Sequence, residues 1–494
     1  MNHKVAGNMK DCAIKDCDIK MRHKKDWHKN NWHNKNTHNK NWIKKTGIVL
    51  FWLACWSVLA VTVDNKIILA APWQTAGELG RMLLKSSFYL SAARSLLRIS
   101  LGFLSGFLAA VLLAAAGRRF PFLEELFEPA MKLIKTVPVA SFVVLLLIWW
   151  GSSFLASAIC FLVVLPNVYI SALEGLKAAD GKLLEMAKVF HMPLRNRFFY
   201  IYRPALKPFL YSGLKISLGM CWKSGVAAEV IATPEYTVGE QLYLSKVFLN
   251  TAGVFAWTAV VILLSIVFEK IVMRLTERFF RWEPACKKSG ASAGKRLTEA
   301  SGGCGGKSTQ QTKAADAESV RRGTICLQAV TKSFGGQPVL KGLFEEYERG
   351  KTYFLTTPSG SGKTTKLHLM AGILKPDSGV LRRPDRVSMV FQEDRLCEEY
   401  DAVKNVELVT GDARRAEAAL LRLLPEEALR KPCAQLSGGM KRRVAVVRAM
   451  EAESEAVLLD EPYTGMDEDT KMRTKAYIRE RQKGRLLIVA THIF

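Results

Sequence analysis

The sequence predicts a multidomain chain, in which an all-α polytopic membrane domain precedes an α/β domain. The chain has 494 residues, which is too long for one ordinary hydrophobic core. Apolar residues make up 49% of the chain while charged residues still reach 23%, a mixture typical of a membrane part joined to a soluble part. Long apolar runs stop near residue 274, and short strand-like runs alternate with helical patterns from Ile325 onward.

Two polar segments are expected to flank the membrane domain. Residues 1–45 hold twelve Lys/Arg and four Asp, and we expect a disordered basic leader rich in Asn and His. Metal binding by its histidines with Cys12 and Cys17 is the alternative. Residues 284–322 are rich in Gly, Ser, Ala and Lys without apolar periodicity, which predicts a flexible linker. The predicted membrane domain is therefore 46–283, and the predicted α/β domain is 323–494.

The net charge of +26 raises the question of nucleic-acid binding. The leader contributes +8 and the linker +5, so half of the excess lies in the two polar segments. Much of the remainder borders apolar runs, where positive residues accumulate on the cytoplasmic side of membrane proteins. We therefore expect no nucleic-acid partner, and a nucleic-acid-binding ATPase is the weakest alternative.

Six apolar runs are expected to span a lipid bilayer, because a span needs about 20 residues and six such runs in series are not explained by buried core helices. They are 46–63, 95–116, 137–150, 154–173, 209–231 and 255–273. Lys223 and Glu229 lie within the fifth run. A charge inside a membrane is a functional hypothesis by default, but the two residues could equally pair with each other or face the cytoplasmic coupling surface.

The distribution of Lys and Arg predicts the topology. With the N-terminus inside, loops 117–136 and 174–208 are cytoplasmic and hold eleven Lys/Arg, against four in the outer stretches 65–93 and 232–254. The prediction is a multi-pass protein of the cytoplasmic membrane, with the N-terminus and the α/β domain in the cytoplasm.

A phosphate-binding loop is predicted in "TTPSGSGKTTKLHLMAG", residues 356–372. A strand precedes this stretch and a helix follows it, as the pattern G-x-x-x-x-G-K-[ST] requires, although Thr357 replaces the first glycine. Backbone N–H groups of 358–364 would cradle the β-phosphate, Lys363 would reach the β- and γ-phosphates, and Thr364 would ligate Mg²⁺. Thr357 removes no donor but would be strained if its φ were positive. The expected nucleotide-binding residues are Thr357, Pro358, Ser359, Gly360, Ser361, Gly362, Lys363, Thr364 and Thr365.

An acidic pair follows the apolar strand "AVLLDEP". Asp460 is expected beside the Mg²⁺, and Glu461 is placed to polarise the attacking water. A solvated turn would also explain two adjacent acids. The pair lies about 97 residues after Lys363, with "LSGGM" (436–440) just upstream, and this favours a catalytic interpretation.

With these motifs, residues 323–494 resemble the ATP-binding domain of ATP-binding cassette (ABC) transporters, an α/β P-loop NTPase fold. The resemblance implies that Gln392 in "VFQEDR" senses Mg²⁺ and touches the membrane domain, and that His492 holds the γ-phosphate. It also implies that Phe334 in "KSFGG" stacks on adenine, although a packed strand residue is the alternative for Phe334. In "LSGGMKRR" and "YTGMD", the residues implied to contact nucleotide across a dimer are Ser437, Gly438, Gly439 and Asp467. The chain ends at Phe494, so the domain is expected to be short at its C-terminus.

Residues 174–208 resemble the cytoplasmic motif E-A-A-x-x-x-G-x9-I-x-L-P, whose helix docks on the ATP-binding domain in ABC importers. Four residues match in register: Glu185, Ala187, Ile201 and Pro204. Three depart from it: Met186, His191 and Arg203. Residues 68–282 more widely resemble permeases of nitrate, sulfonate, taurine and bicarbonate importers, through "SLLRISLGFLSGFLAAVLL", "KTVPVASFVVLLLIWWG" and "WKSGVAAEVIA".

The resemblance implies a type I importer permease of six helices fused to its own ATPase, acting as a half-transporter. One chain has one phosphate loop and one copy of the family's signature motif, which "LSGGMKRR" matches, so a homodimer is expected, with ATP and Mg²⁺ as cofactors and an extracytoplasmic substrate-binding protein as partner. The solute would be small and anionic or polar, such as a sulfonate, taurine, nitrate or a thiamine precursor. The alternatives are a half-exporter of the same superfamily and a membrane regulator that binds ATP without transport.

Overall fold

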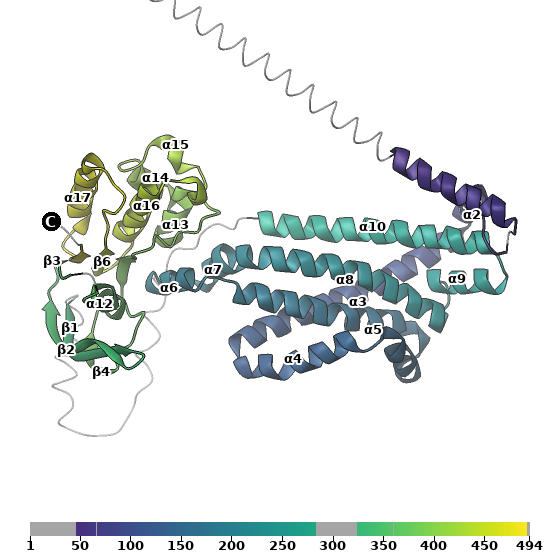
Figure 1. Cartoon of the computed structure of the whole chain (residues 1–494), viewed down its shortest axis with the longest axis horizontal. Coiled ribbons are helices and arrows are strands. Elements are labelled where there is room, and N and C mark those ends of the chain that lie inside the picture. The colour runs from purple at the N-terminus through teal and green to yellow at the C-terminus, as the bar shows by residue number, and fades with distance from the viewer. Residues whose placement is uncertain (1–45, 66, 283–323, 359, 492–494) are drawn as a thin grey trace, which may run out of the picture. The chain divides into compact units, whose positions relative to one another are not determined.

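The computed structural model describes residues 46–65, 67–282, 324–358 and 360–491 (Figure 1). These residues form two compact units. The first holds the described residues up to Gly106 with Thr136–Val164 and Leu218–Lys270. The second holds Phe107–Lys135, Leu165–Ser217 and the described residues from Ile271 onward.

The first part of the chain is helical, as the sequence predicts, and belongs to a membrane-like helical domain. After the helix Thr46–Val63, its elements are α2 (Pro72–Leu83), α3 (Ser86–Arg119), α4 (Pro121–Thr136), α5 (Val139–Lys177), α6 (Gly181–Val189), α7 (Leu194–Arg197), the π-helix η1 (Phe198–Tyr202), α8 (Arg203–Ala232), α9 (Val238–Val247) and α10 (Thr251–Arg281). Within the described residues, four helices are long and apolar enough to cross a membrane: Thr46–Val63, Ser86–Arg119, Val139–Lys177 and Thr251–Arg281.

The number four differs from the six predicted spans for two physical reasons. The predicted runs 137–150 and 154–173 both fall in α5, whose helical geometry breaks at Gly151 (φ 70°, ψ −177°). The piece of α5 before this break is only about 18 Å long, too short to cross a bilayer. The run 209–231 is helical within α8, but Lys215, Lys223 and Glu229 lower its hydropathy.

Small residues let the helices of the first unit approach closely. A Cβ added at Gly102 on α3 would lie 2.4 Å from the carbonyl oxygen of Ser157 on α5. A Cβ at Gly225 on α8 would lie 2.8 Å from Cys160 Sγ on α5 and 3.0 Å from Ile99 on α3. Close packing through glycine is typical of helices that associate in a membrane, where no hydrophobic force drives the helices together.

The second part of the chain is an α/β domain, confirming the predicted fold class. Its elements are β1 (Ile325–Phe334), β2 (Gln337–Tyr347), β3 (Thr352–Leu355), α12 (Lys363–Met370), β4 (Ser378–Arg382), β5 (Val387–Val390), α13 (Ala402–Thr410), α14 (Ala413–Leu420), α15 (Glu426–Leu429), the 3₁₀-helix η2 (Cys433–Gln435), α16 (Gly438–Glu451), β6 (Ala456–Asp460), α17 (Glu468–Gln482) and β7 (Leu486–Ala490).

Two sheets organise this domain. The parallel sheet has the order β3-β7-β6-β5, and β5, β6 and β7 are buried at every residue, which explains their continuous apolar sequences. The antiparallel sheet has the order β2-β1-β4. Because parallel strands end at the same edge, the turns after β3, β5 and β6 are brought to one side of the sheet.

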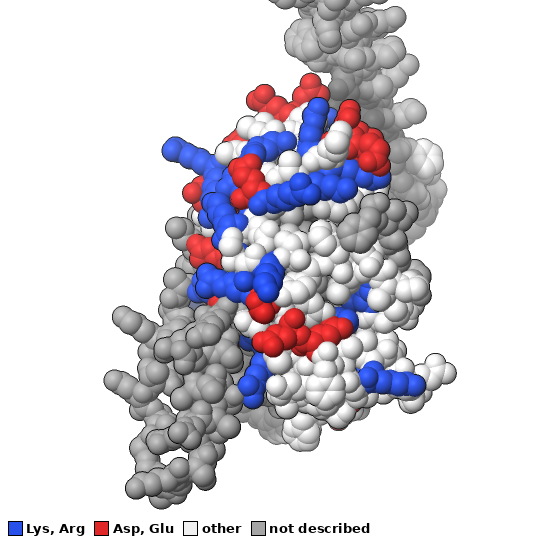
Figure 2. Space-filling model, turned by 90° about the vertical axis from the view of Figure 1, so that its left-hand side faces the viewer, with Lys and Arg blue, Asp and Glu red and all other residues white. Residues whose placement is uncertain are grey.

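The surface of this domain carries charges of both signs. Figure 2 shows one face of this domain, on which Lys/Arg and Asp/Glu side chains are intermingled. A broad area of the same face carries few charged side chains. This face therefore lacks the single basic stripe that electrostatic binding of nucleic acid requires.

Candidate functional site

The predicted phosphate-binding loop connects β3 to α12. Gly360 and Gly362 have φ of 84° and 85°, a left-handed conformation that glycine adopts without strain. A Cβ at Gly362 would also lie 3.0 Å from Val339 Cγ1. Thr357 is not among the described residues with a positive φ, so the strain foreseen for a β-branched residue at this position does not arise.

The ammonium group of Lys363 lies within the loop. Its Nζ donates to the carbonyl oxygen of Thr357 and, at 3.1 Å, to that of Pro358. Ser361 Oγ donates to Thr357 Oγ1 at 2.7 Å, a hydrogen bond that glycine at 357 could not accept. Thr364 and Thr365 follow in the first turn of α12 and are half-buried. The ammonium group of Lys363 and the N-terminus of α12 therefore both lie at this loop, an arrangement suited to binding phosphate.

Asp460 and Thr364 form the candidate magnesium site. Asp460 is the last residue of β6 and is buried, and its carboxylate is hydrogen-bonded to the side chain of Thr364. Burial raises the pKa of the Asp460 carboxyl, and the Thr364 hydrogen bond only partly opposes this. Asp460 Oδ2 has no hydrogen-bond partner among the described residues. A buried carboxylate oxygen without a donor, beside a hydroxyl, fits a Mg²⁺ ligand set completed by water and phosphate.

Glu461 directly follows Asp460 at the edge of the sheet. Its φ of 49° is left-handed, an uncommon conformation for glutamate that is often found at functional positions. Its backbone N–H donates to Ala490 O of β7 at 2.9 Å, and its Oε2 accepts from Thr464 Oγ1 at 3.3 Å. The backbone therefore turns the Glu461 side chain away from the direction that a regular continuation of β6 would give it.

The signature motif lies at the start of α16. Ser437 caps this helix, with Oγ accepting from Met440 N at 3.4 Å, and Ser437 and Gly438 are exposed. A Cβ at Gly439 would lie only 2.4 Å from Gly465 O, in the loop that leads to Asp467. An exposed helix N-terminus without side-chain obstruction is suited to an anion brought by another molecule.

Asp467 caps α17, with Oδ2 accepting from Thr470 N at 3.4 Å. Its hydrogen bonds with Thr470 lower the pKa of the Asp467 carboxyl. Asp467 is exposed, so its carboxylate can be reached by another molecule at the surface of this domain.

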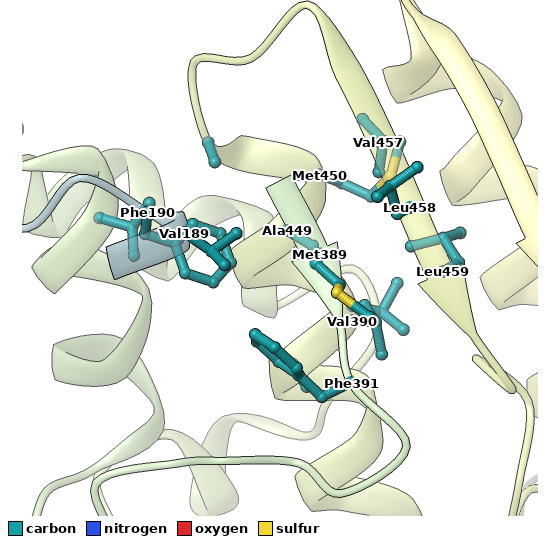
Figure 3. Packing of buried hydrophobic residues seen from close by; sticks show 14 of the residues in the cluster. Val189, Phe190, Met389, Val390, Phe391, Ala449, Met450, Val457, Leu458 and Leu459 are labelled. Carbon is teal, nitrogen blue, oxygen red and sulfur yellow. The ribbon is translucent and has the colours of Figure 1, made fainter. Parts of the chain in front are cut away.

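Gln392 follows β5 with an exposed side chain. Because β5 and β6 are parallel neighbours, with Val390 paired to Leu459, Gln392 and the acidic pair lie at the same edge of the sheet. Figure 3 labels Val390, the last residue of β5, and Leu459, its neighbour on β6 and the residue before Asp460.

Two buried arginines of α16 hold the segment after β5, and sequence reasoning missed both. Arg442 donates from Nη1 to Phe391 O and from Nη2 to Gln392 O, each at 2.5 Å. Arg448 donates to Arg395 O at 2.7 Å and to Asp394 O at 2.9 Å. The signature helix thereby fixes four backbone carbonyls around Gln392. The only sequence signal was that these two arginines lie on α16 among apolar residues, most of which are buried.

Phe334 ends β1 and is 48% exposed, with Lys332 Nζ 5.6 Å from its ring centroid. The alternative of a packed strand residue is therefore excluded. An exposed aromatic ring near a cation can stack on a flat base.

The helix α6, which carries the importer-like motif, docks on the α/β domain through ion pairs. Glu185 Oε2 accepts from Arg395 Nη1 at 2.7 Å, and Lys182 Nζ donates to Glu393 at 2.6 Å. Arg395 also stacks on Phe391, with its Cζ 4.0 Å from the ring centroid. The partners Glu393 and Arg395 both belong to the segment directly after Gln392.

The apolar side of this motif joins the core of the α/β domain. Ala187 and Ile201 are buried in one cluster with residues of β5, β6 and α16, together with Val189 and Phe190. Figure 3 shows Val189 and Phe190 next to Met389 and Ala449. Burial of this apolar surface makes the contact a packed interface rather than a chance approach of charges.

Two departures from the motif have structural explanations. His191 has a φ of 49°, so it adopts the left-handed conformation for which the motif has glycine, and its Nε2 lies 2.9 Å from Asp385 O. Arg203 is buried and donates to the carbonyl oxygens of Phe279, at 3.2 Å, and of Trp282. It thus ties the start of α8 to the end of α10.

A cavity of about 580 Å³ lies beside this docking contact. Pro204, Ile201 and Lys182 line it from the helical side, and Glu393 and Arg395 line it from the α/β domain.

Lys223 and Glu229, the charged residues of the fifth predicted run, do not pair with each other. Glu229 is buried, with Oε2 accepting from Ser95 Oγ at 2.6 Å and from Gly239 N at 3.2 Å. Ser95 Oγ in turn accepts from Val238 N at 2.9 Å, so the carboxylate fastens α3 and α8 to the N-terminus of α9. Lys223 is exposed on the other side of α8.

Several predicted features lie outside the described residues. They are Ser359, His492, the leader 1–45 and the linker 284–322.

Comparisons with known proteins agree with this arrangement. Residues 102–281 match the family "binding-protein-dependent transport system inner membrane component", and residues 340–464 match the family "ABC transporter". The aliphatic sulfonates import ATP-binding protein SsuB 3 of Rhodococcus jostii (strain RHA1) is 37% identical over 177 residues, covering 34% of this chain and 65% of that protein.

Other relatives differ in the solute that they are named for. The Fe(3+) ions import ATP-binding protein FbpC 3 of the same strain is 34% identical over 174 residues, covering 31% of this chain and 50% of that protein. A solved structure of a putative ABC transporter ATP-binding protein from Pyrococcus furiosus is 22% identical, covers 35% of this chain and 92% of that chain, and has a TM-score of 0.32. The chain thus spans less than two thirds of the length of these curated relatives.

The two family matches are consecutive along one polypeptide and coincide with the helical part and the α/β part of the structure. The chain therefore joins, in one polypeptide, a part similar to binding-protein-dependent transport system inner membrane components and a part similar to the ATP-binding domain of ABC transporters.

Proposed function

We propose that this chain is a half-transporter that imports a small anionic or polar solute across the cytoplasmic membrane at the expense of ATP. Two copies form the working unit, with the ABC domains and the N-terminus in the cytoplasm. A separate extracytoplasmic binding protein delivers the solute.

The docking of α6 on the ABC domain is the observation that carries this proposal. A regulator that only binds ATP has no need for a packed contact between its helical part and the segment after Gln392. Here Glu185 and Arg395 form an ion pair at 2.7 Å, and Ala187 and Ile201 enter the core of the ABC domain. Any movement of the Gln392 segment is therefore passed to α6, and from there to α5 and α8, which flank α6 in the chain.

A homodimer is proposed because one chain provides one phosphate loop and one signature motif. The signature end of α16 is exposed, so it is free to meet a phosphate held by Lys363, Thr364 and Thr365 of the partner copy. The remaining contacts proposed for the nucleotide are Phe334 on adenine, the loop 357–362 on the phosphates, and Asp467 at the dimer surface.

Hydrolysis is proposed to take place at the edge of the sheet after β6. Mg²⁺, when bound by Thr364, Gln392 and Asp460, neutralises charge on the β- and γ-phosphates. Glu461 holds and polarises the attacking water, and His492 holds the γ-phosphate. Lys363 leaves the carbonyl oxygens of Thr357 and Pro358 and pairs with the phosphates instead.

The solute class follows from the relatives and stays a proposal. One relative is named for aliphatic sulfonates and another for Fe(3+) ions, so the names alone do not settle the cargo. The permease resemblance to sulfonate, taurine and nitrate importers favours an oxyanion.

Purified full-length protein in liposomes tests the function. We expect Mg²⁺-dependent ATP hydrolysis that Glu461→Gln abolishes. With the extracytoplasmic binding protein added outside, we expect uptake of the solute into vesicles whose lumen contains ATP and faces the ABC domain. Outward transport without a binding protein would favour an exporter. ATP binding without turnover in the wild-type chain would favour a regulator, and either result would overturn the proposal.

A further inference from the structure

The helix α9 is buried at its start and exposed at its end. Its first residue, Val238, is fully buried in a cluster with Phe88 of α3 and Trp257 of α10. At the other end, Val247 is 54% exposed, and Phe248, which directly follows the helix, is 76% exposed. The first turn therefore anchors α9 within the first unit, while its last turn makes few contacts that would resist a movement.

Both turns that join α9 to its neighbours contain residues in the left-handed conformation. Before the helix, Thr233 has a φ of 43° and Tyr236 a φ of 55°, and after it Leu249 has a φ of 52°. This conformation is unfavourable for residues with a Cβ, most of all for a β-branched residue such as Thr233. Strained residues of this kind persist where surrounding contacts hold them, and they are common in segments that switch between arrangements. The two turns are therefore suited to act as hinges.

One buried carboxylate holds the first turn of α9 in place. Glu229 Oε2 accepts from Ser95 Oγ at 2.6 Å and from the backbone N–H of Gly239 at 3.2 Å. Ser95 Oγ also accepts from the backbone N–H of Val238 at 2.9 Å. The approach is close, since a Cβ added at Gly239 would lie 2.2 Å from Glu229 Cβ. The negative charge thus lies at the N-terminus of a helix, where it is favourable.

The same carboxylate has an unused oxygen beside an unused donor. Among the residues that the structure describes, Glu229 Oε1 and Arg98 Nη1 are both buried without a hydrogen-bond partner. Arg98 follows Ser95 by three residues on α3, so the two side chains lie on the same side of that helix, and the guanidinium acts on Glu229 electrostatically. A buried donor and a buried acceptor of opposite charge are costly to leave apart. An arrangement in which they meet would remove this cost.

We propose that Glu229 is the latch of a segment with two positions. In the docked position, which this structure shows, its carboxylate holds Ser95 and Gly239. In the released position the carboxylate pairs with Arg98, the strained turns relax, and α9 moves away from α3 and α8, which exposes Val238. Glu229 is a positioning residue for α9. The inference concerns the first unit alone and does not depend on the proposed function.

Thiol labelling measures how often α9 leaves its docked position. A cysteine in place of the buried Val238 reacts with a water-soluble thiol reagent only when α9 is released. The assay uses Val238→Cys in the purified full-length protein without nucleotide, and the unmodified chain gives the background of its own cysteines. Phe248→Cys is the matched control, because this position is exposed in both arrangements and should label fast in every background.

Two substitutions should change the labelling rate of Val238→Cys in opposite directions. Ser95→Ala removes contacts of the docked position and should raise the rate about tenfold. Arg98→Gln removes the contact of the released position and should lower the rate by about the same factor, but it should have no effect when Glu229→Gln is also present. Glu235→Gln, which removes an exposed carboxylate from the same turn, should change nothing. A rate that rises or stays unchanged in Arg98→Gln overturns the proposal, because Arg98 is then not the partner of a released state.

Gly239→Ala tests the released position without a change in any polar side chain. The added Cβ would lie 2.2 Å from Glu229 Cβ, so the docked position is excluded in this variant. We expect a folded protein with a cooperative thermal transition, in which Val238→Cys labels about as fast as Phe248→Cys. A Gly239→Ala chain that does not fold, or that folds with Val238→Cys still protected, shows that no second position exists and overturns the proposal.

Discussion

The ion pair between Glu185 and Arg395 makes the sharpest prediction about how the two parts of the chain communicate. The Arg395 side chain is only 9% exposed and that of Glu185 is 41% exposed. Two unit charges at about 4 Å attract by about 4 kcal/mol at a partly buried site, before solvent screening and desolvation are counted. After the discount for the exposed Glu185 carboxylate, we expect a net coupling of about 1 kcal/mol, which corresponds to about fivefold in an equilibrium.

A double-mutant cycle measures this coupling. The variants are Glu185→Ala, Arg395→Met and the double substitution, each assayed for solute uptake per ATP hydrolysed in proteoliposomes. Arg395→Met also loses its stacking on Phe391, so its single effect should be the larger one, and the cycle separates the pairwise contribution. The matched control is Lys182→Ala, because the Lys182–Glu393 pair is 56% and 57% exposed and should contribute almost nothing.

The expected result is that ATP hydrolysis persists in all variants while uptake per ATP falls, and that the double variant is no worse than Arg395→Met. The apolar contacts of Ala187 and Phe190 keep α6 docked, so the ABC domain should remain folded. Strictly additive effects, or a Glu185→Ala variant with normal uptake per ATP, would show that this pair does not transmit the motion.

Three further predictions concern the ABC domain. Burial raises the folded-state pKa of Asp460 above its ordinary 3.8, so the ionised carboxylate destabilises the fold increasingly as pH rises from about 3.8 through the raised pKa. Without Mg²⁺ at neutral pH, Asp460→Asn should therefore unfold at a higher temperature than wild type. The variant should also lose the stabilisation by Mg²⁺ and the ATPase activity. A lower unfolding temperature for Asp460→Asn would contradict this. Gly439→Ala must displace the loop at Gly465, because the added Cβ would lie 2.4 Å from the carbonyl oxygen of Gly465. This variant should lower ATPase activity about 100-fold. Nucleotide binding to the phosphate loop should persist, and a filter-binding assay checks this. Wild-type turnover in that variant would refute the steric argument. Arg448→Met leaves two carbonyl oxygens without their donor and should destabilise the domain by about 3 kcal/mol in thermal unfolding, whereas exposed Arg430→Met should be neutral.

The local parts of the site can be predicted from the sequence. The phosphate loop, the acidic pair and the signature motif are each made of residues close together in the chain, so the spacing within each motif is enough to predict it. The α6 motif is equally local, and its role in coupling stays a prediction, with which the Glu185–Arg395 pair is consistent.

The parts that sequence reasoning missed depend on long-range contacts. Arg442 and Arg448 reach carbonyl oxygens about 50 residues away, and no local pattern distinguishes them from solvated arginines. The close approach of Gly439 to Gly465 likewise appears only when α16 and the loop before α17 pack together. The count of six spans stays a prediction: among the described residues four helices are long and apolar enough to cross a membrane, and the predicted runs 137–150 and 154–173 lie on either side of the break at Gly151 in α5.

The central claim is that ATP is hydrolysed between two copies of the chain, and complementation of two inactive variants tests it most directly. Lys363→Ala disables the phosphate loop and Gly439→Asp disables the signature motif, so each homodimer should be inactive. When both chains are coexpressed with different tags and the mixed dimer is purified, one site combines the intact loop of one copy with the intact signature of the other. We predict about half of the wild-type ATPase activity in the mixed dimer. A mixed dimer as inactive as its parents, although both chains are folded and paired, would mean that each site is built within a single chain and would contradict the account.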